Sequence, residues 1–294
     1  MKEITLALGG GGAKGNAHFG VLRVLEREGF QIKGLAGTSA GGVFGAMYAA
    51  GYSPDEIIAR LEQIDQSKLY GHKPGETPAL LGTVGLEQHL YALLDDRTFD
   101  DLRIPFAVVA VDLHSGREVV LNQGRVIDAL MATIALPGIF PPRQWGNYLL
   151  VDGGVLNNVP VVQARAFAPH LPVVAVVLSK PIEEAEHILS PVRLFDHDPL
   201  LKYITRLRVA QAFNYFINAI EIGSRNMTEL RLKVDKPDVI IRPDVENIGL
   251  LDKVCIADVA RKGEIAAEQA LPALKQAVSW QGQLQRRLFK RSTQ

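Results

Sequence analysis

One serine lies in a context that could make it a nucleophile. Ser39 is the central residue of a segment with the pattern G-x-S-x-G, Gly37-Thr38-Ser39-Ala40-Gly41. The segment follows the apolar run 32–36 and precedes an alanine-rich stretch, so Ser39 is expected at a strand–turn–helix junction. The flanking glycines would let the strand and helix pass closely enough to expose its hydroxyl. The alternative, a helix N-cap formed by Thr38 or Ser39, would not require both glycines.

A glycine-rich turn near residue 10 could stabilise a negative charge. The apolar run 4–8 ends in a loop with the pattern G-x-G-x-x-G, Gly10-Gly11-Gly12-Ala13-Lys14-Gly15. Consecutive glycines let backbone N–H groups converge at a helix N-terminus, where they can hold an oxyanion. The pattern is also typical of dinucleotide-binding folds, but the next strand has no acidic residue at its tip to hold a ribose. A turn needed only for close packing is the remaining alternative.

A serine hydroxyl needs a neighbouring proton acceptor. Asp152 follows the apolar run 148–151 and precedes Gly153-Gly154. If the strands are parallel, its carboxylate opens onto the same sheet edge as Gly10 and Ser39, where ligands collect. An aspartate that only caps its own turn is the alternative.

The histidines are weaker candidates for the base. His170, His187 and His197 come late enough in the chain to complete a triad, but they lie in polar or charged stretches and are interpreted as surface residues. His18, just after the glycine loop, is interpreted as a packing or hydrogen-bonding residue.

The elements that must position these residues indicate an α/β fold. Short apolar runs predict strands at residues 4–8, 32–36, 105–111, 118–121, 148–151, 173–178 and 239–242. Segments long enough for crossover helices separate them, which predicts a single three-layer domain with a mainly parallel central sheet. Residues 67–85, rich in glycine and proline, are expected to form a loop that could act as a lid.

Composition excludes some classes of function. The chain has 32 Lys and Arg residues and 32 Asp and Glu residues, so no net field directs it to nucleic acid. Its single cysteine, Cys255, excludes an internal disulfide and a thiolate metal cluster, and is expected to be a buried thiol in a reducing compartment. Neither a signal-peptide h-region nor an apolar run of ~18 residues is visible, which predicts a cytoplasmic protein, soluble or peripheral to a membrane.

Two apolar segments could meet a lipid or a core. One holds Phe213, Tyr215, Phe216, Ile217 and Ile220, which are expected in the core with a lipid-binding trough as the alternative. The tail 280–291 mixes apolar and basic residues, a composition of membrane interfaces, although a solvated terminus is the simpler interpretation.

The glycine loop, the serine pentapeptide and Asp152-Gly153-Gly154 together resemble the signature of the patatin-like phospholipase family. Two further stretches are similar to those that flank the aspartate in its bacterial members, residues 132–142 and 157–160. The resemblance covers about residues 4–180. It implies a catalytic core at 1–180, with 181–294 as an extension of helices and a strand packed on the same domain.

The resemblance also implies roles for single residues. Ser39 would be the nucleophile of a serine–aspartate dyad, Asp152 its proton acceptor, and Gly10, Gly11 and Gly12 the oxyanion loop. Gly15, Gly37, Gly41, Gly153 and Gly154 would support these motifs. Lys14 would either anchor the turn or meet a phosphate headgroup. Substrates would be acyl esters of phospholipids, lysophospholipids or related lipids, hydrolysed without cofactor or metal. An inactive regulatory protein of this fold and a dinucleotide-binding oxidoreductase are the alternatives.

Overall fold

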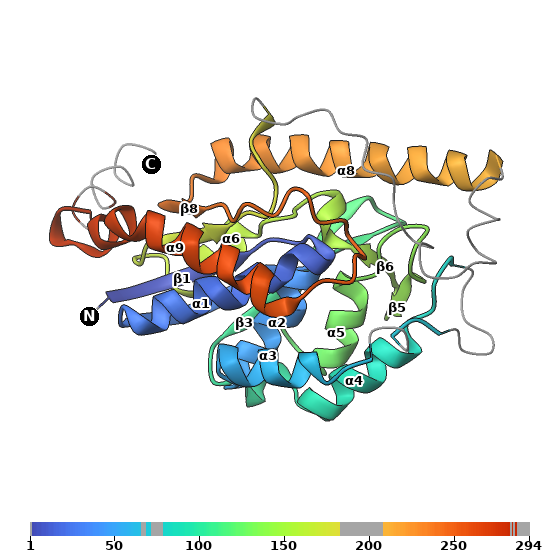
Figure 1. Cartoon of the computed structure of the whole chain (residues 1–294), viewed down its shortest axis with the longest axis horizontal. Helices are drawn as coiled ribbons and strands as arrows, with labels where there is room; N and C mark the ends of the chain where they lie inside the picture. Colours follow the sequence, from blue (N-terminus) through green and yellow to red (C-terminus); the bar gives the residue numbers. More distant parts are fainter. Residues whose placement is uncertain are drawn as a thin grey trace.

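The protein is built on one mixed sheet of eight strands (Figure 1). A computed structural model describes residues 2–65, 69–71, 79–182, 208–282, 284 and 286, with the backbone alone for 208–214. The strands are β1 (Lys2–Leu8), β2 (Phe30–Thr38), β3 (Phe106–Asp112), β4 (Arg117–Leu121), β5 (Arg143–Trp145), β6 (Tyr148–Asp152), β7 (Val173–Val176) and β8 (Val239–Ile241). Their order is β5-β6-β3-β2-β1-β7-β8, and β4 also pairs with β3.

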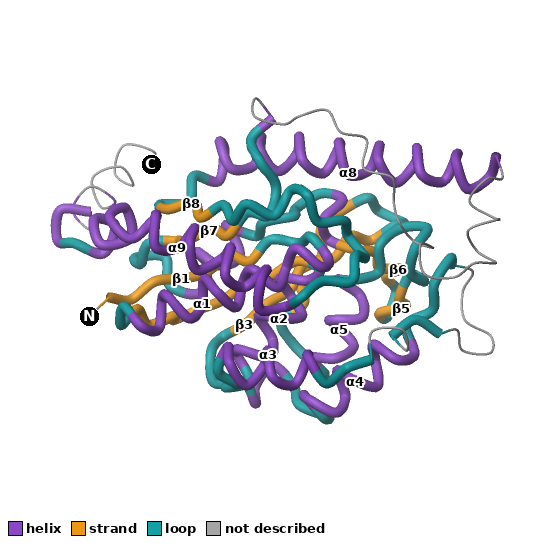
Figure 2. The backbone as a smooth tube through the Cα atoms, viewed as in Figure 1, coloured by secondary structure: helices purple, strands orange, loops and turns teal. Residues whose placement is uncertain are grey.

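Helices cover both faces of this sheet, so the expected three-layer α/β arrangement is confirmed (Figures 1 and 2). The α-helices are α1 (Ala17–Arg27), α2 (Ala40–Ala49), α3 (Pro54–Glu62), α4 (Val84–Leu94), α5 (Val126–Thr133), α6 (Val161–Phe167), α8 (Arg208–Asp235) and α9 (Ile256–Val278). Short 3-10 helices are η1 (Gly12–Asn16), η3 (Phe99–Asp101) and η4 (Gly153–Val155). The helices α1, α2, α5 and α9 pack on one face, and α6 and α8 on the other.

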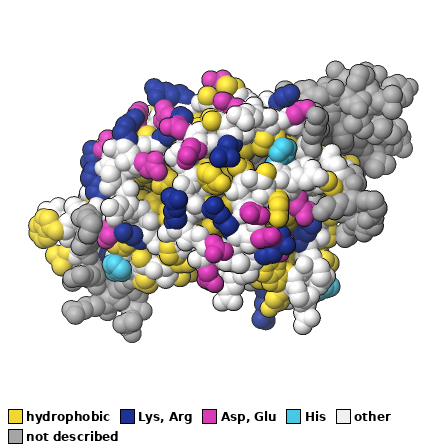
Figure 3. Space-filling model, turned by 90° about the horizontal axis from the view of Figure 1, so that it is seen from below, with side chains coloured by type: hydrophobic (Ala, Val, Ile, Leu, Met, Phe, Trp, Pro, Cys, Tyr) yellow, Lys and Arg dark blue, Asp and Glu magenta, His cyan; other side chains and the backbone are white. Residues whose placement is uncertain are grey.

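Alternation along the strands divides the core between these two faces. On β1, Ile4, Leu6 and Leu8 belong to the main apolar cluster, whereas Ala7 belongs to a smaller cluster that also holds residues of α6. None of the described helices combines the length and apolar character that a membrane span requires. On the face shown in Figure 3, acidic and basic side chains are interspersed among apolar ones.

The sheet is parallel on one side and antiparallel on the other. β1 pairs in parallel with β2 and β7, β2 with β3, and β7 with β8. β3 pairs antiparallel with β4 and β6, and β6 with β5. The links before β4 and β6 are tight turns in which Gly116 and Gly146 take positive φ angles of 66° and 56°, and such short links join only antiparallel strands. Asp152 therefore ends an antiparallel strand, so the condition of parallel strands, on which its place beside Gly10 and Ser39 was predicted, is not met at β6.

The register on β3 brings two strand ends together. β4 pairs with residues 108–112 of β3 and so occupies one of its edges. β2 pairs with residues 106–109 and β6 with residues 110–112, so both must lie on the other edge, one after the other. Thr38 lies opposite Val109, and Asp152 lies opposite Ala110. The carboxyl ends of β2 and β6 therefore meet end to end.

Two glycines let α1 and α9 cross in backbone contact. A Cβ atom on Gly20 would collide with the carbonyl oxygen of Ala260 in α9, and one on Gly263 would collide with that of Ala17 in α1. Because backbone atoms cannot rotate away, the helices can keep this distance only with glycine at both positions. The crossing fixes α1, the helix that follows the glycine loop.

We expect Gly20→Ala to lower the free energy of unfolding by about 1–3 kcal/mol or more, since overpacking a backbone contact forces the helices apart. Gly223→Ala is the matched control, because a Cβ there meets nothing within 4 Å; it should stabilise the chain by about 0.5–1 kcal/mol. Urea unfolding of both variants measures the difference. Equal stability of Gly20→Ala and the parent chain would contradict the crossing.

Candidate active site

Ser39 occupies a strained turn between β2 and α2. Its φ is 53° and its ψ is −125°, a conformation that costs free energy for a residue other than glycine. The Ser39 backbone N–H donates to Thr133 Oγ1 at 3.0 Å, and that hydroxyl donates to the Val109 carbonyl at 2.5 Å. A Cβ on Gly37 would collide with the Gly41 backbone, and one on Gly41 with the backbone of β1, so both glycines of the pentapeptide are sterically required.

The N-cap alternative for this turn is wrong. The Ser39 side chain makes no capping hydrogen bond to α2, and the Thr38 hydroxyl donates instead to the Asn157 carbonyl at 2.9 Å. The Ser39 side chain lies close enough to the Asp152 carboxyl to lower its pKa as a hydrogen-bond donor. Ser39 remains half-buried and thus open to a ligand, whereas Asp152 is only 3% exposed.

Burial dominates the electrostatics of Asp152. Loss of solvation raises the pKa of its carboxyl from 3.8 to about 6, and hydrogen bonds from Ser39 and from the Gly154 N–H oppose this rise. The Gly154 bond, 2.7 Å to Oδ1, shows that Asp152 also caps its own turn, as the alternative proposed. The carboxylate is thus a proton acceptor that changes charge close to neutral pH while bonded to a serine hydroxyl.

The glycine loop offers two free donors beside this pair. The Gly10 N–H donates to the Asn158 carbonyl at 3.1 Å, so it is already in use. The N–H groups of Gly11 and Gly12 have no acceptor among the described residues, and both glycines are partly exposed. Gly12 has a φ of 56°, and a Cβ there would collide with the Leu250 carbonyl, which accepts from the Ala13 N–H at 2.9 Å.

His18 and Lys14 both make polar contacts at the glycine loop. His18 Nε2 lies 2.8 Å from the Gly9 carbonyl, and complete burial lowers the pKa of the imidazole to about 4. The ring is therefore neutral and donates its Nε2 proton, which confirms its interpretation as a hydrogen-bonding residue. Lys14 Nζ forms an ion pair with Glu221 Oε1 of α8 at 3.3 Å, and its role in the turn or toward a phosphate headgroup stays a prediction. Gly15 lies against the ring of Phe44.

The structure also tests the predicted exposure of the late histidines and the predicted burial of Cys255. His170 is exposed, as expected, while His187 and His197 lie outside the described residues. Cys255 is exposed, so the expectation of a buried thiol is wrong; it precedes α9 at the N-cap position instead of lying on the buried face. Of the loop 67–85, residues 67–68 and 72–78 lie outside the described part, which leaves the lid a prediction.

A separate apolar cluster borders the site. Its members come from four segments and are Ile139, Phe140 and Ile217, with Tyr70, Leu81, Leu136, Leu250 and Leu251 packed against them. Leu250 contacts the glycine loop, because its carbonyl accepts from the Ala13 N–H at 2.9 Å. Leu136 is the chain neighbour of Ala135, whose carbonyl accepts from the Asp152 N–H at 2.9 Å.

The apolar segment of α8 is only partly in the core. Ile217 is buried in the cluster just described and Ile220 is half-buried, but Tyr215 and Phe216 are exposed, so the core expectation is wrong for those two. They lie on the outer face of the helix, and the Phe213 side chain is outside the described set. In the tail, Trp280 and Leu284 are exposed.

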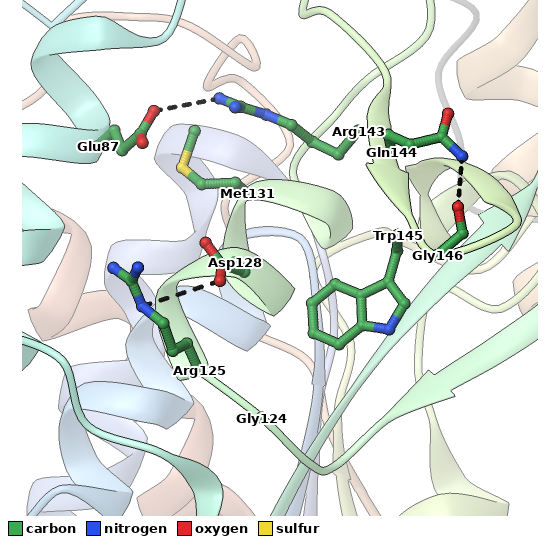
Figure 4. Close-up of a pocket in the computed structure, with 9 residues that line it drawn as sticks. All are labelled: Glu87, Gly124, Arg125, Asp128, Met131, Arg143, Gln144, Trp145 and Gly146. Carbon is green, nitrogen blue, oxygen red and sulfur yellow. Dashed lines mark hydrogen bonds and ion pairs between the residues drawn. The ribbon is translucent and has the colours of Figure 1, made fainter.

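A hollow near one end of α5 is separate from the Ser39 and Asp152 pair. A cavity of about 400 Å³ opens near the N-terminal end of α5, whereas Thr133, at the C-terminal end, touches Ser39. Its charged side chains pair with one another, Arg125 with Asp128 and Arg143 with Glu87 (Figure 4). The chemistry of the Ser39 and Asp152 pair, not cavity size, identifies the candidate site.

Sequence reasoning assigned no role to two residues that shape this site, Thr133 and Asn158. Thr133 holds the Ser39 backbone, and Asn158 bonds both backbone groups of Gly10. Both lie in the stretches 132–142 and 157–160, whose similarity to flanking segments of known sequences was the one available signal.

Comparisons with known proteins agree with this geometry. Residues 6–165 match the family model for patatin-like phospholipase. An uncharacterized NTE family protein of Mycobacterium tuberculosis is 36% identical over 162 residues, which cover 54% of this chain and 44% of the relative. A second one from that organism is 29% identical over 295 residues, 92% of this chain and 47% of the relative.

Two further similarities are more distant. Lysophospholipase NTE1 of Candida glabrata is 26% identical over 291 residues, covering 93% of this chain and 16% of that protein. The chain thus spans less than half the length of these relatives. The crystal structure of VipD from Legionella pneumophila matches 93% of the chain and 66% of its own length with a TM-score of 0.52 and 14% identity, which is a likeness of fold.

The raised pKa of Asp152 predicts a cost in stability. Its folded-state pKa of about 6 exceeds the unfolded value, so stability falls as pH rises from about 4 to 6 and stays lower above that window. The difference corresponds to about 3 kcal/mol at most. Asp152→Asn removes the buried charge and should be more stable than the parent chain at pH 8, by up to this amount, with little difference at pH 4. Urea unfolding at the two pH values measures it, and an unchanged or lower stability at pH 8 would refute the assignment.

Proposed function

The chain belongs to the patatin-like phospholipase family, and we propose that it is a serine esterase that hydrolyses acyl ester bonds of phospholipids, lysophospholipids or related lipids. The observation that carries the proposal is the juxtaposition of the half-buried Ser39 with the buried Asp152 where β2 and β6 meet on β3, together with the pKa of that carboxyl, which burial raises to about 6. A carboxylate of this pKa is ionised at neutral pH and basic enough to accept a proton from an attacking hydroxyl.

The first half of the reaction forms an acyl-enzyme. Ser39 Oγ attacks the ester carbonyl carbon while its proton passes to the Asp152 carboxylate. The tetrahedral oxyanion accepts hydrogen bonds from the Gly11 and Gly12 N–H groups, which have no acceptor among the described residues. Collapse of this intermediate breaks the bond to the alcohol, which leaves with the proton held by Asp152.

The second half regenerates the serine. Water gives a proton to Asp152 and attacks the acyl carbon, and the same two N–H groups stabilise the second oxyanion. When the bond to Ser39 Oγ breaks, the serine recovers its proton from Asp152 and a fatty acid is released. One ester and one water become one acid and one alcohol, with no cofactor in the balance.

The apolar cluster that includes Leu136, Phe140 and Leu250 supports an acyl lipid as the substrate. It adjoins both Asp152 and the glycine loop, so an acyl chain of an ester bound at Ser39 would meet apolar side chains. The name of the Candida glabrata relative, a lysophospholipase, agrees with this class. Access to such lipids implies peripheral contact with membranes, with the exposed Trp280 and Leu284 as one candidate anchor.

Replacing the nucleophile tests the proposal directly. Ser39→Ala should abolish covalent labelling by a fluorophosphonate probe and reduce hydrolysis of a lysophospholipid or a p-nitrophenyl acyl ester by at least about 10³-fold. Ser115→Ala, which removes a hydroxyl bonded to Asp112, should label like the parent chain. A parent chain that takes up no probe and cleaves none of these esters would reject the proposal in favour of an inactive protein of this fold.

The pH dependence should follow the protonation of Asp152. Only the ionised carboxylate can accept the Ser39 proton, so kcat/KM should fall about tenfold per pH unit below a midpoint near 6 and reach a plateau above it. Assays of a soluble p-nitrophenyl ester between pH 4.5 and 8.5 give the profile. A midpoint near 4 would mean that the carboxyl is not buried during turnover, and a midpoint that persists in Asp152→Asn would assign it to another group.

A further inference from the structure

Asn158 holds Gly10 of the glycine loop with two hydrogen bonds, one through its backbone carbonyl and one through its side-chain amide. The Asn158 carbonyl accepts from the Gly10 N–H at 3.1 Å, and Asn158 Nδ2 donates to the Gly10 carbonyl at 3.3 Å. Both hydrogen-bonding groups of Gly10 are therefore held by one residue, which lies six positions after Asp152. No other described residue holds both backbone groups of a glycine in this loop.

The Asn158 amide also lies next to the reacting pair. A Cβ on Gly10 would be 2.5 Å from Asn158 Oδ1 and 3.0 Å from Ser39 Cβ. A Cβ on Gly154 would be 3.1 Å from both Asn158 Oδ1 and Asp152 Oδ1. The asparagine thus stands between the glycine loop and the turn that carries the aspartate.

Peptide planarity connects this grip to the chemistry. The Gly10 carbonyl and the Gly11 N–H belong to one planar trans peptide and point in opposite directions. A peptide between two glycines has little steric resistance to a flip, which would exchange the Gly11 N–H for a carbonyl oxygen and repel an oxyanion. Holding the Gly10 carbonyl therefore holds the Gly11 N–H in its direction.

The preceding peptide is held in the same way from the other side. His18 Nε2 donates to the Gly9 carbonyl at 2.8 Å, and the N–H of that peptide belongs to Gly10, which donates to Asn158. Two consecutive peptides thus have their carbonyls tied to side chains, His18 on α1 and Asn158 after β6. Of these two peptides, only the one tied to Asn158 carries an N–H without an acceptor among the described residues, that of Gly11.

We propose that Asn158 is a positioning residue for ester hydrolysis, which keeps the Gly11 N–H aimed at the oxyanion by its hydrogen bond to the Gly10 carbonyl. The inference rests on the proposed function, because it assigns a purpose to a donor that only acyl transfer would use. The positioning role also requires an uncharged amide at residue 158. An aspartate would lose the donor and would place a second negative charge beside Asp152.

Three variants test the proposal: Asn158→Ala, Asn158→Asp and the neighbouring Asn157→Ala. Removing the Asn158 amide should lower kcat for a p-nitrophenyl ester and the rate of fluorophosphonate labelling about 10- to 100-fold with little change in KM, less than the 10²- to 10³-fold typical of deleting a donor itself. Asn158→Asp should lose at least as much, and the midpoint of its pH profile should move upward by about one unit because the new carboxylate disfavours ionisation of Asp152.

Asn157→Ala provides the structural comparison. The Asn157 amide is buried and donates to Glu118 and Gln163, away from Gly10. Its loss should lower the melting temperature but leave the pH midpoint near that of the parent chain. If Asn158→Ala does not fold, the nearly isosteric Asn158→Asp still tests the grip.

The outcomes are distinct. Asn158→Ala with kcat within threefold of the parent, or Asn158→Asp with an unshifted pH midpoint, would overturn the positioning role while Ser39-dependent hydrolysis stands. A fall in kcat that only tracks the melting temperature, equally in the Asn157 and Asn158 variants, would also overturn it. A parent chain without Ser39 labelling would reject the proposed function itself.

Discussion

The site depends on a single constraint, the sharing of one edge of β3 by two strands that approach from opposite directions. β4 occupies the other edge, so β2 and β6 must lie end to end, with Thr38 opposite Val109 and Asp152 opposite Ala110. Neither strand can extend without displacing the other. A hydroxyl and a carboxylate that are far apart in the sequence therefore meet where the two strands end, with Asp152 as the last residue of β6 and Ser39 in the turn just after β2.

The buried position of Asp152 at the end of β6 sets the pKa of its carboxyl. The interactions that determine the pKa of Asp152 are burial and hydrogen bonds from Ser39 and Gly154, and none of the charged side chains in the described part of the chain is among them. Burial raises the pKa of a carboxyl, and no cation among these interactions lowers it again. The same low-dielectric position makes the carboxylate a better proton acceptor and a less stable anion, so basicity and the cost in folding stability have one origin.

Glycines give the site its tight turns, and hydrogen bonds from two polar side chains hold the glycine loop. Gly37 and Gly41 leave room for the strained Ser39 turn, and the mobility that glycine brings to the loop at Gly10 is countered by hydrogen bonds from His18 and Asn158. These two residues come from separate parts of the chain, His18 from α1 and Asn158 from the segment after β6. The α1–α9 crossing and the turn after Asp152 are thus linked to the direction of the loop donors, although neither supplies a group to the reaction.

Local patterns predicted much of this arrangement. Apolar runs located seven of the described strands to within a few residues but not β5, and the strand–turn–helix context of Ser39 is confirmed because steric rules for glycine act over a few residues. The direction of β6 was not predictable in this way, because a short apolar run is compatible with parallel or antiparallel pairing. Equally, the exposure of Cys255 depends on where α9 begins, which a lone cysteine does not indicate.

The sequence by itself determined which residues could act: a serine in a glycine-flanked turn, an aspartate at the end of a strand, and a run of glycines before a helix. Only the tertiary structure decided that the serine and aspartate lie together, that Gly10 donates to Asn158 while Gly11 and Gly12 have no acceptor among the described residues, and that Asn158 bonds the Gly10 carbonyl. The physical reason is the separation along the chain over which each interaction acts. Backbone conformation is set by neighbours in the chain, whereas burial, register and hydrogen-bond partners are set by segments more than a hundred residues away.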